Sequence, residues 1–132
     1  MDNLLRKFHD AELNIVKHDR KASTVCLTFV NLDGTIEEVA FNGVRAFRVV
    51  DYGPQNVVSR LLSSSLPGHL SSKDIFLHVT WINSTIEGKC LVNKDAIDKL
   101  VEQVEKNDLI LFILEPSWGA EISILARAFF LS

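Results

Sequence analysis

The segment from Ala22 to Phe41 constrains the fold more than any other part of the chain, because it has the pattern of two strands that meet at a tight turn. A two-residue loop at Asp33-Gly34 would mix polar and apolar side chains on both faces of the hairpin. A three-residue loop, Leu32–Gly34, separates them, and we predict it as a type I turn with Gly34 in the left-handed conformation. In this register the apolar side chains lie on one face of the hairpin, which we expect to be buried and call the dry face: Val25, Leu27, Phe29, Val39 and Phe41.

The composition is typical of a folded globular chain. Of its 132 residues, 47% are hydrophobic and 23% are charged. Two domains of half this length would each bury too little surface, so we expect a single domain over residues 1–132. The longest apolar run, Leu109–Leu114, is far shorter than the roughly 20 residues that cross a bilayer. The N-terminal residues also lack a signal-peptide pattern, so we expect a cytoplasmic protein with no membrane partner.

Two further segments beside the hairpin have a strand pattern. His9–Val16 begins to alternate, and Ala11, Leu13 and Ile15 would face one way. Val44–Tyr52 alternates after an Asn-Gly turn signal. We expect it to form a fourth strand in a meander.

Two amphipathic helices are predicted. The first follows Pro54, and apolar residues at positions 57, 58, 61 and 62 would form its buried face. The second is capped by Asn93 or Asp95 and ends at Lys106-Asn107. Its apolar stripe consists of Ile97, Leu100, Val101 and Val104.

The remaining segments also predict strands. Asp74–Ile82 alternates, and Ile86–Val92 would form a shorter strand. The apolar run Leu109–Leu114 indicates a central strand covered on both faces, which would pair with a last long strand, Glu121–Leu131. We therefore predict an α+β fold with a mostly antiparallel sheet and two helices, with a two-sheet sandwich as the alternative geometry.

No set of residues in the sequence is typical of a catalytic, metal or cofactor site. The histidines and cysteines lack recognisable ligand spacing, and the scattered glycines build no phosphate loop. In His9-Asp10 and His18-Asp19, side chains of neighbouring strand residues would point to opposite faces. Both cysteines lie in apolar strand patterns, and we expect them to be reduced, buried and inert.

Charge and aromatic residues favour a protein partner. The net charge of −3 argues against nucleic acid, which requires a basic surface, and suits a basic protein. Two turns place an aromatic residue beside carboxylates, and such residues are frequent in binding hot spots. The alternative for the tryptophan is a lid folded over the core. The predicted partner-binding residues are Trp118, Glu115, Glu121, Tyr52 and Asp51.

Three short segments carry a resemblance to known proteins: Phe8–Leu13, Phe41–Phe47 and Pro116–Glu121. They resemble segments of small, mostly uncharacterised bacterial proteins. Some of those proteins are similar to the immunity proteins encoded beside polymorphic or contact-dependent toxins. The resemblance implies a cytoplasmic inhibitor that occupies the active site or an exosite of a cognate toxin domain in contact-dependent growth inhibition. It assigns no site residue.

Three functions follow from these observations. The leading hypothesis is a non-enzymatic protein-binding module, an immunity protein that neutralises a basic toxin domain. The second is a small enzyme or ligand-binding domain with a pocket between sheet and helices and His78 or His9 as the acid–base group. The third is a structural subunit that adds strands to the sheet edge of a partner.

Overall fold

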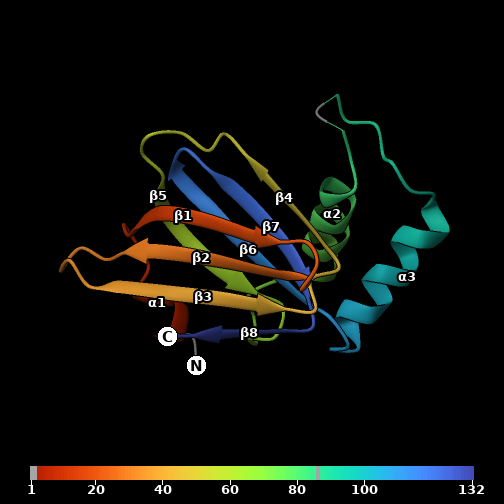
Figure 1. Cartoon of the computed structure of the whole chain (residues 1–132). Coiled ribbons are helices and arrows are strands. Elements are labelled where there is room, and N and C mark those ends of the chain that lie inside the picture. Colours follow the sequence, from red (N-terminus) through yellow and green to blue (C-terminus); the bar gives the residue numbers. More distant parts are fainter. Residues whose placement is uncertain (1–2, 86) are drawn as a thin grey trace.

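The computed structural model describes residues 3–85 and 87–132, which form one antiparallel sheet with helices (Figure 1). The strand order is β4-β7-β6-β5-β1-β2-β3-β8, so the predicted α+β fold is confirmed. The strands are β1 (Glu12–Asp19), β2 (Thr24–Val30), β3 (Ile36–Asn42), β4 (Ala46–Val50), β5 (Val57–Ser63), β6 (Ile110–Trp118), β7 (Glu121–Ala126) and β8 (Ala128–Leu131). The helices are α1 (Asn3–Arg6), α2 (Ser72–Ile82) and α3 (Lys94–Glu105). None of the described helices has the length and apolar character needed to cross a bilayer.

The sheet curls over itself but remains a single sheet. Figure 1 shows β1, β2 and β3 crossing in front of β5, β6 and β7, with β8 below β3. Glu12 in β1 pairs with Val57 in β5 and joins the two parts at one corner. At another corner the chain passes from β7 to β8 through Arg127, whose backbone N–H donates to the carbonyl oxygens of Asn42 and Gly43 at 3.1 and 3.3 Å. The alternative of a two-sheet sandwich is therefore wrong.

The β2–β3 hairpin has the predicted register. Val25 pairs with Phe41 and Phe29 with Glu37, and Gly34 has a φ of 87°. All the side chains assigned to the dry face are at most 1% exposed. They form the core inside the curled sheet, where the Phe41 ring lies 4.8 Å from that of Phe112 in β6.

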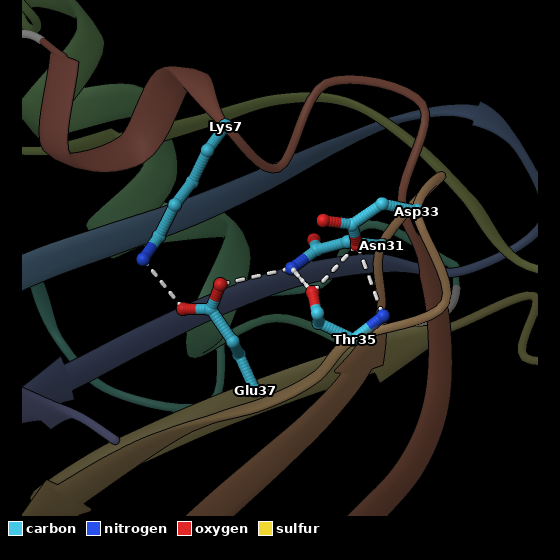
Figure 2. A network of polar contacts seen from close by, with 5 residues as sticks. All are labelled: Lys7, Asn31, Asp33, Thr35 and Glu37. Carbon is cyan, nitrogen blue, oxygen red and sulfur yellow. Dashed lines mark hydrogen bonds and ion pairs between the residues drawn. The ribbon is translucent and has the colours of Figure 1, made fainter.

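A polar network fastens the turn of this hairpin to the segment that follows α1 (Figure 2). Lys7 Nζ lies 2.6 Å from Glu37 Oε2, and Asn31 Nδ2 donates to Glu37 Oε1 at 2.9 Å. Asp33 Oδ1 accepts from the hydroxyl of Thr35 at 2.7 Å and from its backbone N–H at 3.0 Å. These bonds, the hydroxyl bond first, hold the pKa of Asp33 below its ordinary value. The bonds of Asp33 to Thr35 thus hold the turn from within, and Glu37 links it to Lys7 outside the hairpin.

Two expectations for the middle of the chain are wrong. The strand predicted over Val44–Tyr52 forms as β4, but it pairs with β7 instead of continuing a meander beside β3. The predicted first helix is strand β5. Its pairing with β6 is irregular between Val57 and Val58 and again between Val58 and Arg60. Such bulges shift the alternation of buried residues, which gave the apolar residues of this strand a helix-like spacing.

The predicted strand Asp74–Ile82 is also wrong, because these residues belong to α2. The hydroxyl of Ser71 accepts from the N–H of Asp74 at 3.1 Å, and the Asp74 carboxylate accepts from the N–H of Ser71 at 3.0 Å. This capping box starts the helix, and the bonds from Ser71 lower the pKa of Asp74. The buried residues of α2 follow helical spacing: Ile75, Val79 and Ile82.

Helix α3 is confirmed, with Asn93 as its cap. Helices α2 and α3 cover the outer face of β6 and β7 and build a second core there. Strand β6 is therefore covered on both faces, as predicted. Of the expected strand Ile86–Val92, Ile86 lies outside the described residues, and the rest shows an isolated bridge between Ser84 and Cys90. The last strand is interrupted at Arg127, so β7 pairs with β6 as predicted while β8 pairs with β3.

Candidate functional site

Trp118 ends β6, and its side chain is 68% exposed. The turn to β7 passes through Gly119, with a φ of 82°, and Ala120, which is fully buried. The tight turn buries its small residue and directs the large ring into solvent. Trp118 is therefore no lid over the core.

Asn56, a residue that the sequence did not single out, ties this turn to the loop after β4. Only 4% of Asn56 is exposed. Its Oδ1 accepts from the N–H groups of Gly53 and Ala120, both at 3.0 Å, and its Nδ2 donates to the carbonyl of Gly53 at 2.8 Å. A Cβ on Gly119 would lie 2.5 Å from the carbonyl oxygen of Gln55. The two loops are thus packed backbone against backbone.

This contact brings the predicted residues to one end of the molecule. Val50 pairs with Glu121, which places Asp51 beside the β6–β7 turn. Tyr52, 48% exposed, follows in the same loop, and its hydroxyl donates to the carbonyl of Asn14 at 2.8 Å. We call the predicted set the Trp118 surface: Asp51, Tyr52, Glu115, Trp118 and Glu121.

The carboxylates of this surface differ in their pairing. Glu115 Oε1 accepts from Arg60 Nε at 2.6 Å and lies 2.5 Å from its Nη2, so the charge of Glu115 is compensated. Glu12 adds a carboxylate that the prediction missed, because its Oε1 accepts from Gln55 Nε2 at 3.1 Å. Asp51 is exposed and Glu121 is partly exposed. The surface is therefore acidic even with Glu115 neutralised.

An apolar groove of about 420 Å³ adjoins Tyr52 between β1 and β4. The expectation that Ile15 shares a face with Leu13 is wrong, because the pairing of β1 with β2 shifts between these two residues. Val16 packs against the core in its place, and Ile15 is left 48% exposed. Both Ile15 and Val16 line the groove, together with Phe47. The Trp118 surface thus continues through Tyr52 into this apolar groove.

His78, one of the two candidate acid–base groups, lies on α2 against β7. Its Nδ1 is 3.1 Å from Ser123 Oγ, and Ser123 is fully buried, so no substrate can reach that hydroxyl. Burial lowers the pKa of His78, and the carboxylates of Glu121, Asp74 and Glu115 oppose this effect. The pair supports the contact between α2 and the sheet.

The other candidate, His9, does converge with its neighbour. The expectation of opposite faces is wrong here because Asp10 has a φ of 66° and precedes the strand, and His9 Nδ1 lies 3.1 Å from Asp10 Oδ2. Within the described part of the chain, no three His, Cys, Asp or Glu residues gather as they would around a metal ion.

The cysteines are free, as expected, but only partly buried. The thiol of Cys26 lies 3.6 Å from Glu38 Oε2. Burial first, and then this carboxylate, raise the pKa of Cys26, which makes the thiol a poor nucleophile.

A local signal for Asn56 exists, because it follows Gly53 and Pro54 in a turn, where asparagine side chains often bond to nearby backbone. Its bond to Ala120 spans 64 positions and could not be read from the sequence. No protein-family model, curated protein or solved structure matches the chain.

Proposed function

We propose that the chain is a non-enzymatic protein-binding module that contacts its partner through the Trp118 surface. The exposure of Trp118 carries this proposal, because 68% of a large aromatic side chain faces solvent on a turn that buried bonds hold in place. Tryptophan and tyrosine are enriched among the residues that dominate binding energy. A ring on a fixed turn also loses less conformational entropy when a partner covers it.

The charges of this end favour a basic partner. Asp51, Glu121 and Glu12 add negative charge around Trp118, whereas Glu115 is already paired with Arg60. Complementary charges steer the encounter of two proteins and raise the association rate, most strongly at low salt. A cationic toxin domain would meet this requirement.

The most specific form of the proposal is an immunity protein that neutralises a cognate bacterial toxin domain in the cytoplasm. Its support is the resemblance of Phe8–Leu13, Phe41–Phe47 and Pro116–Glu121 to proteins similar to immunity proteins, together with the acidic and aromatic surface. In this form the Trp118 turn enters or borders the active site of the toxin.

Co-expression tests the proposal. A toxin domain encoded beside this gene is produced in a susceptible strain, with and without the chain, and growth is measured. We expect the wild-type chain to restore growth, and the Leu32→Ala variant to do so equally, since Leu32 is 80% exposed on the β2–β3 turn, outside the Trp118 surface. Trp118→Ala and Glu121→Lys should lose protection. Growth that Trp118→Ala restores fully would exclude the surface, and no protection by the wild-type chain would exclude the immunity function.

A further inference from the structure

A cavity of about 510 Å³ lies on another part of the molecule, between the α1 segment, β5 and the loop before α2. This volume is within the range of small-molecule sites, roughly 300–1,000 Å³. Backbone bonds hold its walls together, because the N–H of Asp10 donates to the carbonyl of Val58 and the N–H of Val58 donates to the carbonyl of Ala11, both at 2.9 Å. The cavity therefore lies between elements that are fixed to each other.

The ionisable side chains that line the cavity, among the described residues, are all bases: Arg6, His9, Arg60 and His69. This is unexpected in a chain whose net charge is −3. The backbone N–H of His9 donates to the carbonyl of Arg6 at 3.1 Å, so these two residues share one turn on the same wall. Two of the bases face a carboxylate next to the cavity, because His9 Nδ1 lies 3.1 Å from Asp10 Oδ2 and Arg60 pairs with Glu115.

Two of these bases are oriented by bonds that the structure shows. Glu115 binds Arg60 through Nε and Nη2, which leaves the N–H groups of Nη1 for a ligand. His69 Nδ1 accepts from the N–H of Ser63 at 3.2 Å, which holds the ring beside the end of β5. Bonds of this kind fix side chains before a ligand arrives and lower the cost of binding.

We propose that this cavity binds a small organic anion, with a carboxylate or phosphate group held by Arg6 and Arg60. The planar guanidinium matches the geometry of both groups and can bind either in bidentate fashion. Leu62, which is partly buried and lines the cavity, offers apolar surface to the hydrocarbon part of the ligand. The Arg60–Glu115 pair joins this site to the border of the Trp118 surface, but the proposal does not depend on a protein partner.

Titration of the isolated chain with hexyl phosphate, hexanoate and neutral hexanol, followed by amide shifts in NMR spectra, tests the proposal. We expect saturable shifts at residues 5–10, 59–63 and 68–69 with one or both anions and none with hexanol. The stronger of the two anions identifies the head group. Shifts of equal size with hexanol, or no saturable binding of either anion at 10 mM, roughly the weak limit for a fragment of this size, would overturn it.

Charge-matched variants complete the test. The double change Arg6→Gln and Arg60→Gln should weaken binding at least tenfold. Arg20→Gln with Lys21→Gln removes the same charge from the exposed β1–β2 turn and should change affinity less than twofold. If the double variant does not fold, Arg6→Gln alone leaves the Arg60–Glu115 pair intact and should still weaken binding several-fold. Glu115→Gln should strengthen binding, because it frees Arg60 from a competing carboxylate. Equal weakening by both double variants would contradict a specific site.

Discussion

Two turns of the sheet each carry an exposed apolar residue and a left-handed glycine, but they differ in what packs against them. The β2–β3 turn carries Leu32, 80% exposed, and a left-handed Gly34, and the β6–β7 turn carries Trp118, 68% exposed, and a left-handed Gly119. Nothing lies within 4 Å of a Cβ placed on Gly34, whereas one on Gly119 would lie 2.5 Å from the carbonyl oxygen of Gln55. Exposure alone therefore does not single out a binding residue. In the β6–β7 turn, the residues that follow Trp118 pack against a separate loop, the one after β4.

Glycine substitutions should separate the two turns most strongly. In Gly119→Ala the new methyl group meets the Gln55 carbonyl and the left-handed backbone strains a residue with a Cβ, so we expect a loss of about 3 kcal/mol or more in the free energy of unfolding. Gly34→Ala has only the backbone strain and should cost about 1 kcal/mol. Urea denaturation of both variants measures the difference. Equal losses would mean that the β6–β7 turn is not packed against its neighbour.

Removal of the bracing side chain should have the next largest effect. Asn56→Ala leaves the buried N–H of Ala120 without its acceptor and removes both bonds to Gly53, so we expect a loss of about 2–3 kcal/mol. Asn31→Ala removes bonds within the β2–β3 hairpin itself and should cost about 1 kcal/mol.

Hydrogen exchange tests independently whether Asn56 holds the β6–β7 turn in place. The amide of Ala120 should exchange faster in Asn56→Ala, and the amide of Gly34 should be unchanged, because its bond to the carbonyl of Asn31 lies within the other turn. Protection of Ala120 equal to that of the wild type would contradict the bracing role.

The two turns also show what the sequence could predict. The register of the β2–β3 hairpin was predictable because its pattern is local: one loop length sorts every side chain of both strands. Strand β5 was not, because bulges beside Val58 shift its alternation toward a helical spacing. Helix α2 fits both periods, since Ile75 and Val79 agree with either, and its Ser71 to Asp74 capping box was the deciding signal.

The proximity of the residues in the Trp118 surface could not be predicted, although single residues of it stand out in the sequence. Trp118 and Tyr52 stand out as aromatic residues in turns beside carboxylates. Their approach depends on Asn56 and on the pairing of β4 with β7, which are long-range contacts that no local pattern contains. The compensation of Glu115 by Arg60 is equally a product of the fold, because strand pairing places these residues opposite each other.

The smallest expected effect concerns the outer face of the β6–β7 hairpin, where His78 contacts Ser123. Burial lowers the pKa of His78 in the folded chain, so near and below its ordinary value of 6.5 the unfolded chain binds more protons. Stability should therefore fall as pH is lowered from 7.5 to 5.5. The variant His78→Gln should show a shallower fall in urea denaturation over this range. An unchanged slope would mean that this histidine is not desolvated.

Binding of the proposed partner, a basic toxin domain, to Trp118→Ala and Leu32→Ala, measured by titration calorimetry, tests the central claim most directly. Both changes remove exposed side chains and should alter the free energy of unfolding by less than about 0.5 kcal/mol. We predict that Trp118→Ala weakens the affinity at least about 30-fold, as expected for a hot-spot residue worth 2 kcal/mol or more, and that Leu32→Ala leaves it unchanged. Equal affinities of the two variants would contradict the assignment of the Trp118 surface.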